Sequence, residues 1–146
     1  MDDAKLLRQF EDLSLPFSQW THRAHVKVAF LCLRAHAFDE AISLLRKGIK
    51  AYNVANEVLE SPTSGYNETT THAFLHLIAA TMAAYGEAMP TPTADVFCDT
   101  HPQLMTRNAL RFFYSPDRRM HPQAQTTFIE PDLAPLPIIV VRAPRP

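Results

Sequence analysis

The sequence predicts an all-α protein, a compact single-domain helical bundle with a proline-rich, extended C-terminal arm. Two observations carry this prediction. Apolar residues recur with helical spacing from Asp2 to Tyr85. The three glycines all precede residue 90, whereas ten of the twelve prolines lie from Pro90 onward. Because proline interrupts helices, we expect short elements in the second part of the chain. We expect the bundle over 1–133 and the arm over 134–146.

The composition indicates a globular domain that does not bind nucleic acid. The chain has 146 residues, 47% of them hydrophobic and 20% charged, which suffices for one hydrophobic core. Its 14 basic and 15 acidic residues nearly cancel, and no basic patch is evident. Nucleic acid is therefore not an expected partner, because a phosphate backbone attracts clustered Lys and Arg.

Several absences favour a cytoplasmic protein. No apolar run reaches the roughly 18 residues of a membrane span. The N-terminus lacks the basic and apolar regions of a signal peptide. Cys32 and Cys98 lack the spacing of a metal or redox motif, and free buried thiols suit a reducing compartment. We therefore expect a cytoplasmic protein that does not enter a membrane.

Two helices are predicted before residue 36. Asp2 to Leu13 has the spacing of a short amphipathic helix. Ser18 is a suitable N-cap for a second helix that runs to about Ala35. This second helix carries apolar residues on nearly every side, which is typical of a buried, central helix.

Two longer helices are predicted next. Phe38-Asp39-Glu40 resembles the start of a helix that continues to about Asn56, with Asp39 as its N-cap. The segment 61–65 is predicted to form a turn. A fourth helix is predicted from Tyr66 to Tyr85, with Gly86 as its C-cap.

Short elements are predicted over the remainder. Thr93 is expected to cap a helix over 94–99, and Pro102 to open one that ends near Tyr114. Ser115-Pro116 and His121-Pro122 each combine a cap with a first-position proline. Residues 138–141 could make one strand, but with no partner strand in view an extended arm is the better prediction.

The first polar segment, Trp20–His25, places two histidines three residues apart in a helix. Residues at this spacing share a helix face, so the imidazoles of His22 and His25 should point the same way. Such a pair can bind a ligand or a metal ion. It can also be a pair of core histidines satisfied by hydrogen bonds.

The second polar segment, Gly65–His76, aligns one carboxylate and two imidazoles. Glu68, His72 and His76 are spaced four residues apart and should lie along one helix face. The three consecutive threonines at 69–71 are poor helix formers, so a constraint other than helix propensity is expected there. The alternative is an ordinary helix start, with an acidic residue at the positive end of the helix dipole.

The two segments together predict a site if their helices are neighbours. The side chains of His22, His25, Glu68 and His72 would then converge at one end of the bundle. Bundle-core metal sites are built from such pairs on facing helices, and this donor set suits a divalent metal such as zinc, iron or manganese.

A metal-free pocket is the second interpretation. Glu68, His22 and His25 would be its catalytic acid and base groups. A small ligand would be oriented by Trp20, Thr21, Tyr66 and Asn67. The third interpretation is a buried hydrogen-bond network that only fixes the pairing of the helices.

A third group of residues could bind an anion. Arg107 and Arg111 are spaced four apart, and with Arg118 or Arg119 they could hold a negative group. Arg111 and Tyr114 are accordingly further candidate ligand contacts. Arginines in such a pattern more often form a solvated face.

The function predicted from these patterns is that of a small-molecule-binding protein or a small enzyme with a His/Glu pocket, with or without a metal. No nucleotide-binding loop, nucleophile elbow or CxxC pair supports a more specific chemistry. The competing class is a structural or interaction protein, a helical adaptor or a homo-oligomer, whose hairpins and arm bind another chain.

Four motifs together resemble those of a family of small, mostly bacterial helical proteins of unassigned function. They are Trp20-Thr21-His22 with His25, Tyr52-Asn53, the segment 65–69 (GYNET) and the segment 130–137 (EPDLAPLP). The resemblance covers roughly Phe10 to Pro137. Members of that family often carry His at the position of Asn67, so the resemblance implies a cluster of three histidines and one glutamate. Asn67 would replace one of those ligands here, or the role would move to His72.

Overall fold

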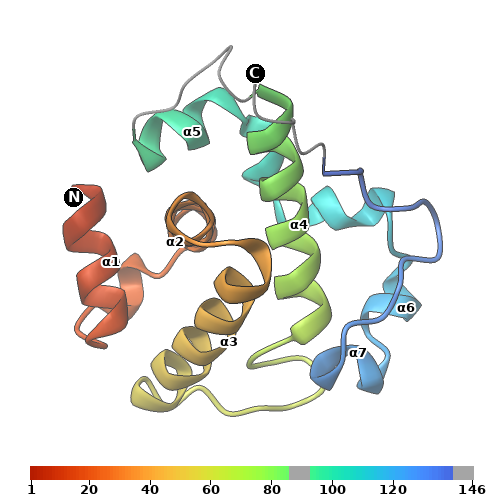
Figure 1. Cartoon of the computed structure of the whole chain (residues 1–146). Helices are drawn as coiled ribbons and strands as arrows, with labels where there is room; N and C mark the ends of the chain where they lie inside the picture. The colour runs from red at the N-terminus through yellow and green to blue at the C-terminus, as the bar shows by residue number, and fades with distance from the viewer. Residues whose placement is uncertain (86–92, 140–146) are drawn as a thin grey trace.

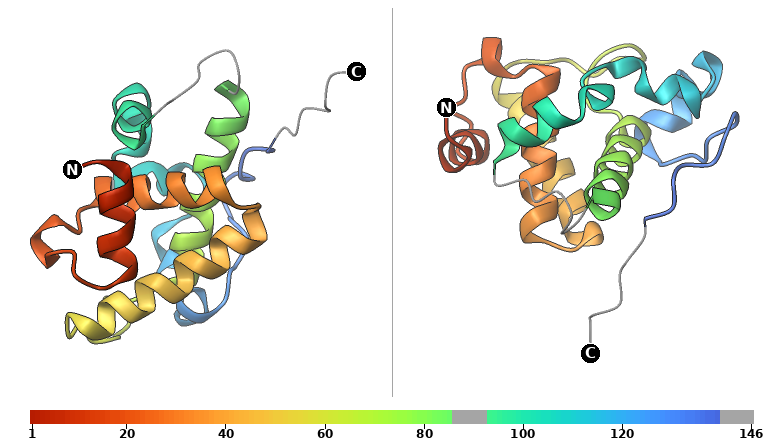
Figure 2. Two further views of the ribbon diagram at one scale, coloured as in Figure 1. Left: turned by 60° about the vertical axis from the view of Figure 1, so that its left-hand side comes forward. Right: turned by 90° about the horizontal axis from the view of Figure 1, so that it is seen from above.

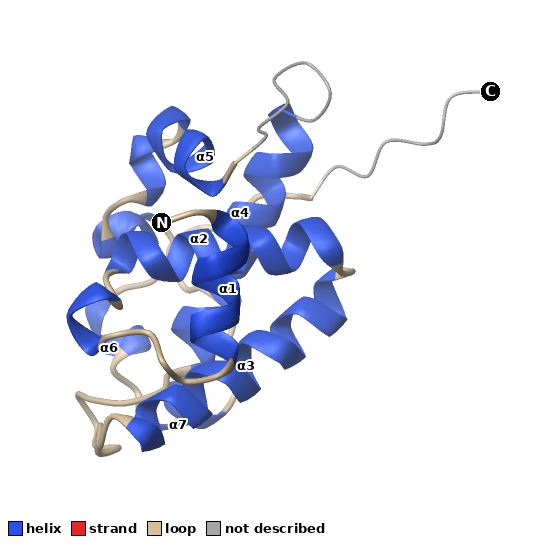
Figure 3. Cartoon of the chain, turned by 90° about the vertical axis from the view of Figure 1, so that its left-hand side faces the viewer, coloured by secondary structure: helices blue, strands red, loops and turns tan. Residues whose placement is uncertain are grey.

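The computed structural model describes residues 1–85 and 93–139, and over these ranges the fold is all-α, as predicted (Figure 3). The α-helices are α1 (Asp3–Glu11), α2 (His22–Ala35), α3 (Phe38–Ala55), α4 (Glu68–Tyr85), α5 (Ala94–Thr100), α6 (Pro116–Arg119) and α7 (Pro122–Thr126). The 3₁₀ segments are η1 (Phe17–Gln19), η3 (Pro102–Leu104) and η4 (Arg107–Phe112). Within the described ranges, β pairing is limited to an isolated bridge between Ser61 and Ser64.

Helix α2 is the centre of the fold. Figure 1 shows it end-on, with α1, α3, α4 and α5 placed around it, and it contacts all four. Its side chains Val26, Val28 and Phe30 are almost fully buried. The prediction of a central helix that is apolar on most sides is therefore confirmed.

The start of α2 differs from the sequence prediction. Ser18 lies in η1, and the N-cap is Thr21, whose hydroxyl accepts a hydrogen bond from the Ala24 amide at 3.2 Å. The break between η1 and α2 leaves Trp20 outside the helix. Its indole ring stacks on Phe10 at 4.8 Å and on His25 at 3.8 Å between ring centroids.

Helices α3 and α4 follow the prediction closely, with shifted starts. Helix α3 begins at Phe38, and its N-cap is Ala37, which makes no side-chain cap hydrogen bond. The predicted Asp39 cap is therefore wrong. Helix α4 begins at Glu68, and the side-chain oxygen of Asn67 accepts a hydrogen bond from the Thr70 amide at 2.9 Å. Gly86, the expected C-cap of α4, lies outside the described residues.

The single helix predicted from Pro102 to Tyr114 is wrong. The chain forms η3 and η4 instead, and the Thr106 hydroxyl accepts from the Asn108 amide at 3.1 Å to begin the second segment. The caps predicted at Thr93, Ser115 and His121 are confirmed, since each side chain accepts a backbone hydrogen bond.

Residues 134–139 form no regular element and run beside α4. The imidazole Nε2–H of His76 donates to the carbonyl of Pro137, and Leu136 packs against the core. The two views of Figure 2 show this segment beside the helices. Residues 140–146 lie outside the described residues. They include half of the strand considered over 138–141 and the end of the predicted arm. No helix among the described residues is long and apolar enough to cross a membrane.

At Gly48, helix α3 packs closely against the ring of Phe10, which stacks on Trp20. A Cβ atom at Gly48 would lie 2.6 Å from Cε2 of Phe10, whose ring is held between Trp20 and Tyr52. Alanine favours helices over glycine by about 1 kcal/mol, but overpacking of a core costs about 1–3 kcal/mol. We therefore expect Gly48→Ala to lower the free energy of unfolding, as measured by urea denaturation.

The control is Lys47→Ala, an exposed neighbour on the same helix. It should change the free energy of unfolding by less than about 0.5 kcal/mol. A stabilised Gly48→Ala variant would show that the ring of Phe10 is free to move.

Candidate functional site

The two polar segments meet at a cavity of about 530 Å³. Helices α2, α3 and α4 supply about half of its lining, and the chain over 58–67 before α4 supplies much of the rest. Segments η1 and η4 and helices α6 and α7 also contribute. The predicted site residues that line it are Trp20, His22, His25, Tyr66 and Asn67. The expectation that the second and fourth helices are neighbours is confirmed by their contact.

His22 enters the cavity with one nitrogen already bonded. Its Nε2 lies 2.8 Å from the carbonyl oxygen of Leu104. A carbonyl only accepts, so Nε2 carries the proton and the neutral ring leaves Nδ1 as an acceptor. Burial lowers the pKa of His22, and the nearby charge of Arg107 lowers it further.

His25 has the opposite tautomer for the same reason. Its Nδ1–H donates to the Thr21 carbonyl at 2.8 Å, which leaves Nε2 as the acceptor. Burial beneath Trp20 lowers the pKa of His25 to about 4. Both imidazoles are therefore neutral at physiological pH. Thr21 does not line the cavity and acts only through this carbonyl and its cap.

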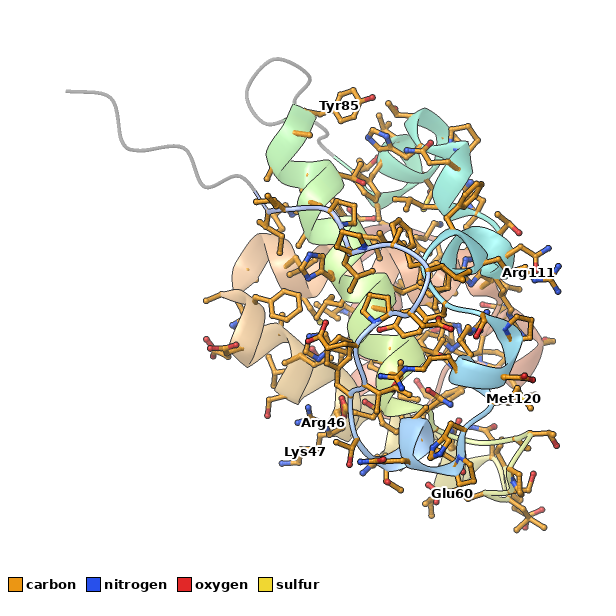
Figure 4. All side chains as sticks on the ribbon, turned by 90° about the vertical axis from the view of Figure 1, so that its right-hand side faces the viewer. Arg46, Lys47, Glu60, Tyr85, Arg111 and Met120 are labelled. Atoms are coloured by element: carbon orange, nitrogen blue, oxygen red, sulfur yellow. The ribbon has the colours of Figure 1, made fainter. Side chains whose placement is uncertain are left out.

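Glu68 does not line the cavity. Its carboxylate is buried and accepts hydrogen bonds from Nε and Nη2 of Arg46 on α3, the latter at 3.2 Å. It also accepts from the hydroxyl of Tyr66 at 3.1 Å, and burial next to this carboxylate raises the pKa of Tyr66. In Figure 4, Arg46 lies on one side of α4, and the cavity residue Met120 lies on the other.

His72 also turns away from the cavity. Its ring stacks on Phe128 at a centroid distance of 4.0 Å and lies 5.4 Å from the ring of Phe38. Over residues 1–85 and 93–139, no group of three or more His, Cys, Asp or Glu side chains could hold a metal ion.

The predicted metal cluster of His22, His25, Glu68 and His72 is therefore not assembled. Glu68 and His72 share one face of α4, as their spacing predicts, but that face packs toward α3 and the segment after α7. Thr71 and Phe74, on another face of the helix, look into the cavity. The acid–base pairing of Glu68 with a histidine fails for the same reason.

Two further ligand contacts predicted from the sequence are placed elsewhere. Arg111 is exposed and does not line the cavity (Figure 4). Tyr114 is fully buried, and its hydroxyl donates to the Ile129 carbonyl at 2.7 Å. Burial raises the pKa of Tyr114 to about 12.

The cavity receives Arg107 and Arg119 instead. Arg107 and Arg111 were expected to share a face because residues four apart do so in an α-helix. They lie in a 3₁₀ segment, where three residues complete a turn, so positions four apart diverge by about 120°. Arg119, named from the sequence as a candidate partner of Arg107 in holding a negative group, comes from α6 and lines the same cavity.

The triplet Thr69–Thr71 has a tertiary explanation. The hydroxyl of Thr69 donates to the carbonyl of Thr127 at 2.9 Å and accepts from the amide of Ile129 at 3.2 Å. Thr70 and Thr71 line the cavity. The three threonines are therefore explained by their tertiary contacts and not by helix propensity. Thr69 holds the chain after α7, and Thr70 and Thr71 form part of the site.

Comparisons of the chain with protein-family models, curated proteins and solved structures find no match. The motif resemblance drawn from the sequence stays a prediction.

The ion pair between Arg46 and Glu68 is expected to contribute to stability. The Arg46 side chain is partly exposed, but removing it leaves the buried carboxylate of Glu68 without its compensating charge. A double-mutant cycle with Arg46→Met, Glu68→Gln and the double variant should give a coupling energy of about 1–3 kcal/mol in urea denaturation.

The matched control is the exposed pair of Arg23 and Asp99, with a nitrogen–oxygen distance of 2.9 Å. Its cycle with Arg23→Met and Asp99→Asn should give less than about 1 kcal/mol, because water screens exposed pairs. Equal coupling in the two cycles would contradict a special role for Glu68.

Proposed function

We propose that this protein binds a small organic molecule in the cavity between α2 and α4. The observation that carries the proposal is the cavity itself, which is about 530 Å³ in volume and walled by both polar segments. Sites for small molecules commonly measure about 300–1,000 Å³ and combine apolar walls with a few polar groups.

The lining combines apolar and polar side chains. Apolar contacts come from Trp20, Val26, Ile49, Phe74 and Ile78. Polar side chains are about as numerous as apolar ones in the lining, and among them are His22 and His25, each with one unprotonated nitrogen. Unprotonated imidazole nitrogens accept hydrogen bonds from a ligand and would serve as the bases if the protein is an enzyme.

Binding that depends on a metal ion has less support than binding without one. The two imidazoles could supply two nitrogen donors, but the predicted carboxylate ligand, Glu68, is held by Arg46 and Tyr66. The network that Glu68 forms favours the structural interpretation for that residue alone. It leaves the cavity available, so binding remains the better proposal for the site.

The test uses Trp20, the single tryptophan of the chain, as a reporter within the cavity. Phenylbutyramide is a neutral probe with an apolar body. Titration with this probe should change the Trp20 fluorescence and saturate, with a Kd on the order of millimolar, as expected for a ligand of this size. The variant Thr70→Phe places a ring in the cavity and should weaken binding at least about tenfold.

The matched control is Thr81→Phe, the same change at a half-buried position of α4 that does not line the cavity. It should bind the probe as the wild type does. Equal binding by wild type and Thr70→Phe would place the probe elsewhere and contradict the proposal, as would the absence of any saturable signal with neutral or anionic probes.

A further inference from the structure

We infer that the ligand carries an anionic group, a carboxylate or a phosphate, on an apolar body, and that Arg107 and Arg119 hold this group. The inference rests on the proposed function, because it assigns a chemical class to the ligand of the same cavity.

The first support is the charge of the lining. Of the described residues that line the cavity, two are arginines and none is Asp or Glu. A cavity with guanidinium groups and no carboxylate attracts negative charge, and its low-dielectric walls strengthen that attraction.

The second support is that these two arginines have no protein partner. In the part of the chain that the structure describes, the guanidinium groups of Arg107 and Arg119 make no hydrogen bond or ion pair. Other arginines do, since Arg23 pairs with Asp95 and Asp99, and Arg46 pairs with Glu68.

Arg119 is the more informative of the two because it is half-buried. Burial lowers the pKa of Arg119, and the charge of Arg111 lowers it further, so its environment disfavours the cation. A partly buried guanidinium without a counter-charge is unfavourable, and a bound anion would supply charge-assisted hydrogen bonds to it.

Arg107 brings positive charge to the histidine end of the same cavity. Its charge is close enough to His22 and His25 to lower the pKa of both. The neutral rings leave the arginines as the cationic groups of the described lining.

The apolar wall determines the other half of the ligand. Phe17, Trp20 and Phe74 present aromatic surface to the cavity, together with aliphatic side chains of α3 and α4. A bare inorganic anion would leave this surface in contact with water. A molecule with both an anionic head and an apolar body satisfies both halves of the lining.

The test compares three probes with the same phenylpropyl body by Trp20 fluorescence: phenylbutyrate, 3-phenylpropyl phosphate and the neutral phenylbutyramide. At least one anion should bind roughly tenfold or more tightly than the amide, as expected for charge-assisted hydrogen bonds. The better anion identifies the head group. Arg107→Gln and Arg119→Gln should each remove most of this preference while changing the affinity for the amide by less than about twofold.

Arg111→Gln is the control, since it removes the same charge from an exposed site beside the cavity. It should leave the anion affinity within about twofold of wild type, and thermal unfolding should confirm that all three variants fold. Binding of the amide and the anions with equal affinity would overturn the inference while leaving the proposed function standing. An equal loss in Arg111→Gln would also overturn it, by showing general surface attraction. Binding of none of the three probes would overturn the proposed function with it.

Discussion

The buried carboxylate of Glu68 is the constraint on which the geometry of the site depends. It must be compensated where it is buried, and Arg46 on α3 and the hydroxyl of Tyr66 provide that compensation. Asn67, one residue earlier, accepts from the amide of Thr70 and so begins the helix at this point. Together these contacts fix the rotation of the first turn of α4 and direct Thr70 toward the cavity.

The same rotation explains why the structure has a cavity and no assembled metal cluster. Residues four apart lie on one face of a helix, so the rotation of α4 about its axis determines the directions of Glu68 and His72 together. Once Glu68 is turned toward Arg46, His72 is carried against Phe128, away from His22 and His25. The positive charge of the described lining therefore comes from Arg107 and Arg119, the two arginines of later segments, and the histidines of α2 are among its neutral polar groups.

Much of this could be predicted from the sequence, because it depends on local patterns. The all-α fold, the central second helix and three of the short caps follow from apolar spacing and capping residues. The orientation of α4 could not be predicted, since Leu75, Leu77 and Ile78 are buried on different sides and leave no clear amphipathic face. The sequence indicates Arg119, with Arg107, as a candidate anion contact, but its approach to the histidines could not be predicted, because it depends on how α6 packs.

The central claim is that His22 and His25 are neutral, half-buried bases in a ligand cavity. Nitrogen-15 NMR of the imidazole rings tests it most directly. At neutral pH we expect a protonated Nε2 in His22 and a protonated Nδ1 in His25, the tautomers that the carbonyls of Leu104 and Thr21 impose. Adding phenylbutyrate should shift the unprotonated nitrogens of both rings and leave His72 unchanged. Charged rings in the free protein, or a shift confined to His72, would contradict the account.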